Sequence, residues 1–351
     1  MALVLGMALA LWLLGAVMGT PRKPRLIMVG VLYLAVLMLH LVLPSGHALR
    51  MATGESAALW LMLGGAVVLA LVYGAGVRAL RRRADKQASD TAPKPTSGSF
   101  SETELNRYAR HIVLREIGGP GQKRMKTAKV LVIGAGGLGA PALQYLAAAG
   151  VGTIGVIDDD VVENANLQRQ VIHTDASIGM PKVFSAEAAM RAQNPYVDVR
   201  PYHRRLTDDL AKDLFAEYDV ILDGTDNFAT RYTANAAAVA TGKPLVSGAL
   251  SQWEGQLSVF DPANGAPCYR CIFPEAPADG LAPSCAEAGV IGPLPGVVGA
   301  MMAVEAIKII TKAGAPLRAE MLIYDALWGE TRKIGLSRRP DCPDCGAVQS
   351  T

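Results

Sequence analysis

The sequence predicts an α/β domain with a mostly parallel sheet and helices on both faces, preceded by three apolar helices. Residues 129–160 read as strand, glycine cluster, helix, strand and acid, which is the order of a βαβ unit. Apolar residues make up 51% of the chain and are enriched toward its front. Further strand patterns follow at residues 219–222, 245–250, 256–260 and 321–324, and a helical pattern at 297–311.

Three runs without Lys, Arg, Asp or Glu open the chain, at residues 2–19, 26–43 and 57–77. A helix of about 20 apolar residues crosses a bilayer, so each run is a plausible transmembrane span. The first run could instead be a signal peptide, but it lacks a positively charged start and two more runs follow it. The sequence therefore predicts a membrane anchor over residues 1–83, in contact with lipid through residues 2–77.

The segments that flank these runs differ in charge. The first flank carries Arg22, Lys23 and Arg25, and the last carries Arg78, Arg81, Arg82, Arg83 and Lys86. The second connection has only Arg50, which Glu55 offsets. Because loops rich in Lys and Arg stay in the cytoplasm, everything after residue 83 is expected there. We expect a multi-pass protein of the cell inner membrane with a cytoplasmic C-terminal domain.

The segment after the anchor predicts a tether and then a new helix. Residues 84–100 are rich in Ala, Ser, Thr and Pro, a composition typical of a flexible linker. Ser101 and Glu104 then form the Ser-x-x-Glu pattern of a capping box, which starts a helix that we expect to reach Glu116. The C-terminal domain is thus expected over residues 101–351.

The glycine cluster predicts a nucleotide site. Gly134, Gly136, Gly137 and Gly139 lie between a strand and a helix, where glycine lets the backbone approach a phosphate closely. The helix that opens there offers unpaired N–H groups and a positive dipole end to an anion. Asp158 ends the following strand, where a ribose-binding acid is expected. By itself this Rossmann-like pattern favours NAD, so an NAD-dependent oxidoreductase is one candidate function.

The segment after the strand-end aspartate reduces the number of candidate functions. Residues 163–170 read Glu-Asn-Ala-Asn-Leu-Gln-Arg-Gln. An Asn-Leu-x-Arg-Gln pattern shortly after the strand-end aspartate resembles the adenylating domain of ubiquitin-activating-type enzymes, whose bacterial members form the MoeB/ThiF/HesA family. The resemblance covers about residues 101–346 and is strongest to the branch that serves molybdopterin synthase. The branch that serves the thiamine-pathway carrier ThiS comes next. The family does not usually have a membrane-spanning front.

This resemblance implies an ATP- and Mg²⁺-dependent enzyme and assigns roles to several residues. Asn166 and Arg169, with Leu167 and Gln168 between them, match the ATP-contacting segment of the family. Lys182 follows Gly-x-Pro and matches a lysine that contacts ATP phosphates. Arg110 matches an arginine that reaches the ATP of the neighbouring subunit, so the resemblance implies a homodimer.

Asp226 is the candidate magnesium ligand. It follows the strand pattern at residues 219–222, and ligands of open α/β sheets bind at the C-terminal ends of strands. A carboxylate there can hold Mg²⁺ together with substrate phosphates. The alternative is that Asp226 caps the next helix. In the family this aspartate is essential, and the residue that corresponds to Asn227 helps to bind the nucleotide.

Composition and the cysteines point to a metal rather than to nucleic acid or disulfides. The net charge of +3 over 351 residues gives no reason to expect a nucleic-acid partner. Four of the five cysteines form two Cys-x-x-Cys pairs, Cys268 with Cys271 and Cys342 with Cys345. Four thiolates match a closed, structural zinc site, as the family has, although four unligated thiols remain the alternative. The fifth, Cys285, matches a cysteine that bonds covalently to carrier or sulfur in some family members.

The function that the resemblance implies is adenylation of the C-terminal glycine carboxylate of a small ubiquitin-like sulfur carrier that ends in Gly-Gly. Arg169, Lys182, Arg110 and Mg²⁺ on Asp226 would neutralise the phosphates. The alternatives are a ThiS-type carrier as substrate, an NAD-dependent oxidoreductase, and a non-catalytic adaptor that binds the carrier. The motifs leave open which carrier and sulfur donor are used, whether Cys285 acts covalently, and why the enzyme is anchored.

Overall fold

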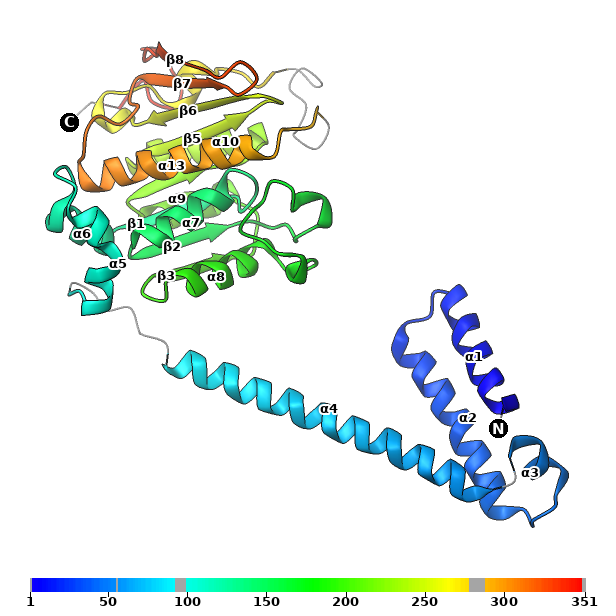
Figure 1. Cartoon of the computed structure of the whole chain (residues 1–351). Helices are drawn as coiled ribbons and strands as arrows, with labels where there is room; N and C mark the ends of the chain where they lie inside the picture. Colours follow the sequence, from blue (N-terminus) through cyan, green and yellow to red (C-terminus); the bar gives the residue numbers. More distant parts are fainter. Residues whose placement is uncertain (1, 55, 92–98, 278–287, 349–351) are drawn as a thin grey trace. The chain divides into compact units, whose positions relative to one another are not determined.

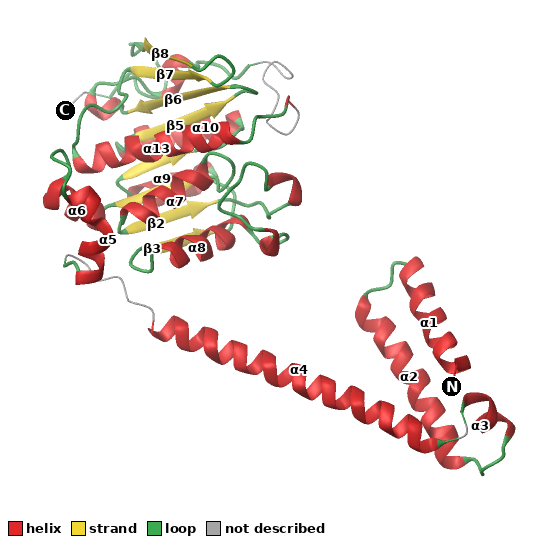
Figure 2. Ribbon diagram, viewed as in Figure 1, coloured by secondary structure: helices red, strands yellow, loops and turns green. Residues whose placement is uncertain are grey.

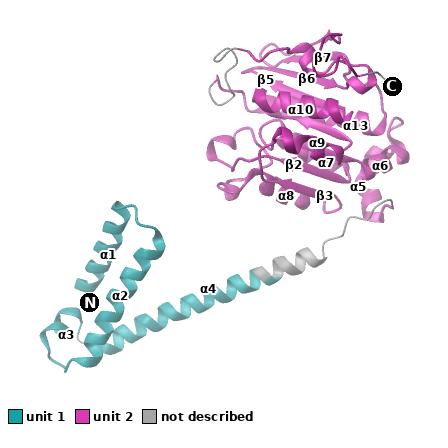
Figure 3. Ribbon diagram, turned by 180° about the vertical axis from the view of Figure 1, so that it is seen from behind, with its two compact units in different colours: residues 1–92 teal, residues 93–351 magenta. Residues whose placement is uncertain are grey.

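A computed structural model of the chain describes residues 2–54, 56–91, 99–277 and 288–348. Contacts divide the chain into two compact units, Met1–Ala92 and Pro93–Thr351 (Figure 3). The described part of the first unit is helical, and the second unit contains the sheet. Helices and strands of both units are labelled along the chain in Figure 1.

The first unit contains α1 (Ala2–Val17), α2 (Arg22–Val42), α3 (Ala48–Thr53) and α4 (Ala57–Thr91). Helix α2 and the Ala57–Arg81 part of α4 are long and apolar enough to cross a membrane. Helix α1 has only 16 residues, so the first predicted span is shorter than the about 20 residues that a crossing needs. The second and third predicted spans reach that length.

Contacts between these helices are few but specific. Val4, Val36 and Trp60 form a small buried cluster that joins α1, α2 and α4. The Tyr33 hydroxyl donates to the carbonyl oxygen of Trp60 at 2.7 Å, which ties α2 to α4. Most large apolar side chains of the unit are exposed, as expected of helices that face lipid.

Helix α4 extends into the segment that was predicted to be a flexible linker. It continues through Thr91, so residues 84–91 of the expected flexible tether are helical. The physical reason is that this stretch contains Ala, Lys and Gln, which favour helix, and no proline before Pro93. Residues 92–98 lie outside the described part of the chain.

The second unit is built on one eight-stranded sheet with the order β3-β2-β1-β4-β5-β6-β7-β8 (Figure 2). The first five strands in that order are parallel, and β6, β7 and β8 continue the sheet antiparallel. The predicted mostly parallel α/β fold is therefore confirmed as a mixed sheet. The strands are β1 (Lys129–Ile133), β2 (Thr153–Ile157), β3 (Asp198–Tyr202), β4 (Val220–Asp223), β5 (Leu245–Leu250), β6 (Glu254–Phe260), β7 (Glu320–Asp325) and β8 (Glu330–Gly335).

Helices cover both faces of this sheet (Figure 2). Successive residues of β1 point to opposite faces, so Val130 and Val132 join one buried cluster while Leu131 and Ile133 join another. The first cluster includes residues of α7 (Gly139–Ala149), α8 (Lys182–Gln193) and α13 (Pro293–Thr311). The second includes residues of α9 (Asp208–Ala216) and α10 (Phe228–Thr241). Helix α13 is also apolar enough to cross a membrane, but 56% of its apolar window is buried in this core.

The second unit begins with α5 (Glu102–Ile112) and α6 (Gly118–Thr127), which precede β1. The predicted capping box is confirmed, because Glu104 N–H donates to Ser101 Oγ at 3.2 Å and Ser101 N–H donates to Glu104 Oε2 at 2.9 Å. Helix α5 ends at Ile112, earlier than the predicted Glu116.

The strand order reverses beside β1. The chain runs from β1 to β2 and β3 on one side, and then returns to place β4 on the other side of β1. The loops that leave β1 and β4 therefore diverge to opposite faces and open a crevice at the C-terminal ends of these strands. Ligands of open α/β sheets bind at such a point, and the predicted site residues lie there.

Candidate active site

A cavity of about 950 Å³ occupies this crevice. It lies at the ends of β1 and β4 and extends beside β5 and β6. Of the residues predicted from the sequence, nine line it: Gly134, Gly136, Gly137, Asp158, Asn166, Arg169, Lys182, Asp226 and Asn227. The fold thus brings together side chains that come from four separate segments of the sequence.

The glycine cluster forms the loop from β1 to α7. Gly134 has φ +90°, which is accessible to glycine at little cost, and its N–H donates to the carbonyl of Ile157. Gly139 does not line the cavity, contrary to its predicted role in binding. A Cβ there would lie 1.8 Å from the carbonyl oxygen of Gly134, so this glycine is required to close the turn. Gly136 and Gly137 line the cavity just before α7 begins, at the end of the helix where an anion would be stabilised.

Asp158 lies at the end of β2, beside the glycine loop. Its Oδ2 accepts the N–H of Ala135 at 2.8 Å, and its Oδ1 accepts the N–H of Asp160 at 2.8 Å. The carboxylate is therefore held against the backbone and half-buried at the cavity wall. This position agrees with a role in binding one end of a nucleotide.

Two cations reach the cavity. Lys182 opens α8, as predicted, and its buried Nζ donates to Asp160 Oδ2 at 2.7 Å. Arg169 follows the short 3₁₀ helix Asn164–Asn166, and its guanidinium donates to the Asn166 side chain at 3.4 Å and to the Ala165 carbonyl at 3.2 Å. Both can stabilise phosphate charge, and they come from two different segments of the chain.

Asp226 is exposed at the cavity mouth and has no hydrogen bond or ion pair with any residue that the structure describes. The alternative that it caps α10 is wrong, because the cap is Asn227, whose Oδ1 accepts the N–H of Thr230 at 2.9 Å. The Asp226 carboxylate is thus left to face ligand and solvent, which fits a Mg²⁺ ligand that binds through one carboxylate and phosphates.

A buried arginine that sequence reasoning missed supports the Asp226 loop. Arg231 of α10 donates to the carbonyls of Thr225 and Gly248 and to Ser247 Oγ, and it lies 3.8 Å from the buried carboxylate of Asp223. Asp223 Oδ1 in turn accepts the backbone N–H of Thr225. The loop between β4 and α10 is therefore fixed on both sides of Asp226.

Gln170 was also missed as a site residue. It lines the cavity, it is buried, and its Oε1 has no partner among the described residues. A buried amide without a partner favours a role in contacting a ligand. Its position immediately after Arg169 was the signal in the sequence that could have identified it.

Several predicted residues lie away from the cavity. Leu167 and Gln168 are not among its lining residues, and Gln168 packs near Gly292 instead. Arg110 is exposed on α5 and does not line the cavity of its own chain. Cys285 lies outside the described residues.

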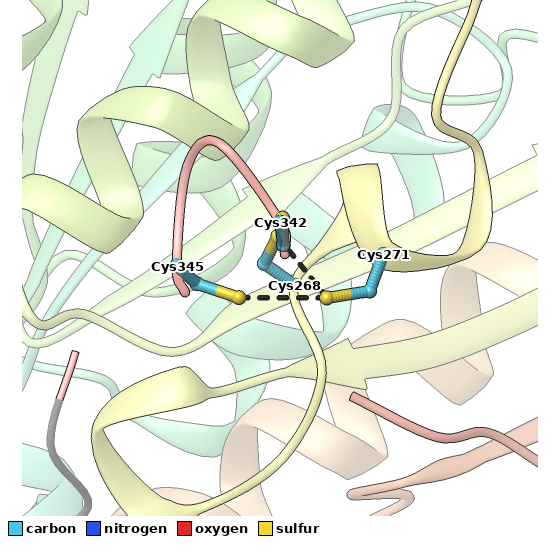
Figure 4. Close-up of side chains that lie close together, drawn as sticks. All are labelled: Cys268, Cys271, Cys342 and Cys345. Carbon is cyan, nitrogen blue, oxygen red and sulfur yellow. Dashed lines mark hydrogen bonds between the residues drawn. The ribbon is translucent and has the colours of Figure 1, made fainter. Parts of the chain in front are cut away.

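The four paired cysteines come together, as predicted (Figure 4). Their Sγ atoms are buried, with separations of 3.9 Å for Cys268–Cys271, 3.5 Å for Cys268–Cys342 and 3.4 Å for Cys271–Cys345. Four sulfurs at about 2.3 Å from a tetrahedral Zn²⁺ lie about 3.8 Å apart, whereas a disulfide has an S–S length of about 2.0 Å. The donor set and spacing therefore fit zinc.

The charge state of the cysteines also bears on the metal. Burial raises the pKa of the Cys345 thiol to about 11 and raises that of Cys268 well above its ordinary value. Such thiols remain protonated at neutral pH unless a cation stabilises the thiolates. A cation held by the four sulfurs would replace these protons as the ligands ionise.

Known proteins resemble the second unit of this chain. The model of the ThiF family matches residues 108–344. The sulfur carrier protein adenylyltransferase of Thermus thermophilus is 49% identical, over 70% of this chain and 93% of that protein. The SAMP-activating enzyme E1 of Haloferax volcanii is 48% identical, over 71% of this chain and 91% of that protein. The probable adenylyltransferase/sulfurtransferase MoeZ of Mycobacterium tuberculosis is 52% identical over 70% of this chain, which spans 64% of that protein.

Solved structures share the fold. The E. coli MccB crystal structure with AMPCPP and MccA has a TM-score of 0.61 and 25% identity, over 69% of this chain and 74% of that chain. The resemblance that Asn166–Gln170 and the other motifs predicted is thereby confirmed at the level of the family. Because the family model matches more than half of the chain, and two relatives are matched over nearly their whole length, the chain belongs to the ThiF family.

Proposed function

We propose that this chain uses ATP to adenylate the C-terminal glycine carboxylate of a small ubiquitin-like sulfur carrier protein and releases pyrophosphate. The observation that carries the proposal is the cavity, in which a glycine loop, Arg169, Lys182 and Asp226 meet at the switch point of the sheet. The names of the relatives at 48% and 49% identity support the same reaction.

The chemistry follows from the charges. An oxygen of the carrier carboxylate attacks the α-phosphorus of ATP, a new P–O bond forms, and the P–O bond to the bridging β-phosphate oxygen breaks. Pyrophosphate leaves with that electron pair, and the carrier becomes an acyl-adenylate. No general base is needed because the carboxylate is already ionised at pH 7. The protein must bring two anions together and neutralise the charge that develops on the phosphates.

Residues of the cavity supply these functions in the proposal. The N–H groups of Gly136 and Gly137 and the side chains of Arg169 and Lys182 bind phosphate oxygens. Asp158 holds the ribose end, and Asn166 and Asn227 contact the nucleotide. Asp226 would hold Mg²⁺, which supplies charge neutralisation between the phosphates when bound.

Arg110 fits this scheme only through a partner subunit. It is exposed on α5 and lies outside the cavity of its own chain. We propose that the enzyme is a homodimer in which Arg110 of the partner subunit completes each site, so that each chain contributes residues to two sites.

The cysteine cluster has a separate role in the proposal. Zn²⁺ held by Cys268, Cys271, Cys342 and Cys345 would have no open position, so it would stabilise the fold rather than take part in the reaction. We propose Cys285 as a point of covalent attachment for carrier or sulfur. The test is to trap a carrier adduct that is lost in Cys285→Ser.

Two sulfur carriers are candidate substrates, and each belongs to a different biosynthetic pathway. A molybdopterin synthase small subunit is the substrate that we propose, and a ThiS-type carrier of thiamine biosynthesis is the second candidate. This chain spans 64% of MoeZ, whose name includes a sulfurtransferase activity as well as an adenylyltransferase activity. We therefore do not assign the supply of sulfur to this chain. Affinity capture of the bound carrier from cells, with each candidate carrier as competitor, separates the two.

The carrier-dependent exchange of pyrophosphate into ATP tests the reaction. We expect exchange only with a carrier that ends in Gly-Gly, and a loss of at least about 100-fold in Asp226→Asn because the phosphates lose their Mg²⁺ ligand. Asp213→Asn, an exposed change on α9, is the matched control and should retain exchange. NADH binding without any exchange would contradict the proposal and favour an oxidoreductase, and carrier binding without exchange would favour an adaptor.

The same assay tests the shared site. Arg110→Ala alone should lose exchange, as Asp226→Asn does. When the two variants are mixed and allowed to form dimers, the mixed dimer regains one intact site, so about one site in four should be active. If mixing restores nothing although mixed dimers form, Arg110 does not act across the interface.

A further inference from the structure

We propose that His173 is a positioning residue that fixes the glycine-rich loop to the start of α8, and thereby prepares the loop amides and Lys182 for ATP phosphates. This inference rests on the proposed use of ATP and adds a residue that none of the motifs above includes. The observation behind it is the position of a buried imidazole that bridges the glycine-rich loop and α8.

Both ring nitrogens of His173 are engaged. The side chain is buried, with Nε2 at 2.9 Å from the carbonyl oxygen of Ala135 and Nδ1 at 2.9 Å from Ser185 Oγ. A carbonyl oxygen can only accept, so Nε2 carries the hydrogen. In the neutral ring Nδ1 then accepts the hydroxyl hydrogen of Ser185. The hydrogen-bond network therefore assigns one tautomer to this histidine.

The Ala135 residue is held on both of its polar groups. Its carbonyl accepts from His173, and its N–H donates to Asp158 Oδ2 at 2.8 Å. Ala135 is fully buried and directly precedes Gly136 and Gly137, which line the cavity. Because glycines have wide conformational freedom, an anchored residue before them restricts how their N–H groups can point.

His173 also connects the segments that carry the two cations. Its backbone N–H donates to the carbonyl of Gln170 at 3.1 Å, next to Arg169. Ser185 lies three residues after Lys182 in the first turn of α8, so the two share one side of the helix. Fixing these groups before ATP arrives lowers the cost of ordering them in the complex.

The hydrogen bond from Ser185 Oγ to His173 Nδ1 requires a neutral imidazole. Burial lowers the pKa of His173, the Lys182 ammonium lowers it further, and the Ala135 bond and the Asp158 carboxylate oppose this only in part. The lowered pKa means that protonation of His173 is unfavourable in the folded loop. The stabilisation of the loop by the neutral imidazole is therefore present at neutral pH and is lost as the pH falls below about 6.5. A protonated ring has two donors and cannot accept from Ser185.

Two substitutions test the role in the full-length chain. His173→Phe keeps the ring shape but removes both hydrogen bonds, so we expect the Kd of a non-hydrolysable ATP analogue to rise about 10-fold. His173→Gln can donate to Ala135 and accept from Ser185, yet it cannot be protonated. We expect it to bind the analogue within about 2-fold of wild type at pH 7.5 and to lose the weakening of wild-type binding at acid pH.

The readouts are equilibrium binding of the analogue from pH 5 to 8 and, in parallel, the exchange assay with carrier. Unchanged binding in a folded His173→Phe variant, or the same acid weakening in His173→Gln as in wild type, would overturn the proposal. If His173→Phe does not fold, the pH profile of His173→Gln decides. Wild-type chain that binds the analogue but shows no carrier-dependent exchange counts against the proposed function alone, because the variant comparison still measures the role of His173.

Discussion

Lys182 enters the cavity already paired with a carboxylate. Its ammonium group is buried, whereas its partner Asp160 is 65% exposed. Phosphate oxygens carry more charge than one carboxylate and form strong charge-assisted hydrogen bonds. We therefore expect the Lys182 ammonium group to bind an ATP phosphate in place of Asp160. The released Asp160 carboxylate would be solvated at little cost because it is exposed.

This exchange of partners gives a prediction for Lys182. Lys182→Met keeps the apolar stem and removes the charge, so kcat/KM for ATP should fall about 10- to 100-fold. Lys212→Met, on the exposed side of α9, is the matched control and should leave the kinetics unchanged. Initial rates of pyrophosphate exchange across ATP concentrations measure the effect. A kcat/KM equal to wild type would remove Lys182 from the phosphate-binding group.

The residues that sequence analysis identified differ in kind from those that it missed. Lys182, Arg169 and Asp226 belong to short motifs whose residue types state their chemistry. Arg231 and His173 act through hydrogen bonds that link separate segments, and such contacts exist only after the chain has folded. Polar residues that are destined for burial have no local pattern that distinguishes them from surface residues.

Elements close to the glycine motif were predictable because their apolar residues follow the period of strand or helix. The strand β8 was not, because all six of its residues are exposed and it pairs only with β7. The strand β3 contains Pro201 and charged residues, which are uncommon in a strand. Edge strands of this kind are specified by their neighbours rather than by their own sequence.

The C-terminal tail shows how a metal site can join remote elements. Asp344, between the last two cysteines, accepts from Asn235 of α10 at 2.7 Å and from Arg270 at 2.9 Å. Asn235 also accepts the N–H of Tyr269 at 2.8 Å. The two cysteine pairs are therefore aligned by polar contacts to α10 as well as by the metal that we propose, and the sequence revealed the ligands but not this alignment.

Zinc content tests the cysteine cluster. Chain purified in reducing buffer should contain about one zinc, and Cys342→Ser should lose most of it, because three thiolates bind less tightly than a closed set of four. The free energy of unfolding should fall and the tail after Leu336 should become sensitive to protease, since metal binding contributes to folding. Cys285→Ser is the control and should retain the metal. Zinc near zero in the wild-type chain would show that the four thiols are unligated.

At the scale of the whole molecule, the two units have surfaces of opposite character. The first exposes apolar side chains along α2 and α4, and the second buries its apolar residues on both faces of a sheet. We propose that the first unit anchors the enzyme in the inner membrane and that the second lies in the cytoplasm. The short α1 leaves the number of spans at two or three.

The side on which the enzyme lies does not depend on that number. The first turn of α2 and the part of α4 after residue 77 are both basic, and two crossings between them return the chain to the same side. A third crossing by α1 would move only the N-terminus. The positions of the basic residues therefore favour the proposed cytoplasmic side for the second unit in either case.

Reporter fusions test this topology. A fluorescent protein fused after Thr351 should fluoresce, and alkaline phosphatase fused after residue 46, between α2 and α3, should be active because that connection faces outward. A phosphatase joined to the N-terminus should be active only if α1 spans the bilayer. An active phosphatase after Thr351 would overturn the orientation, and it would also separate the proposed site from cytoplasmic ATP, because the cavity and the C-terminus belong to one compact unit.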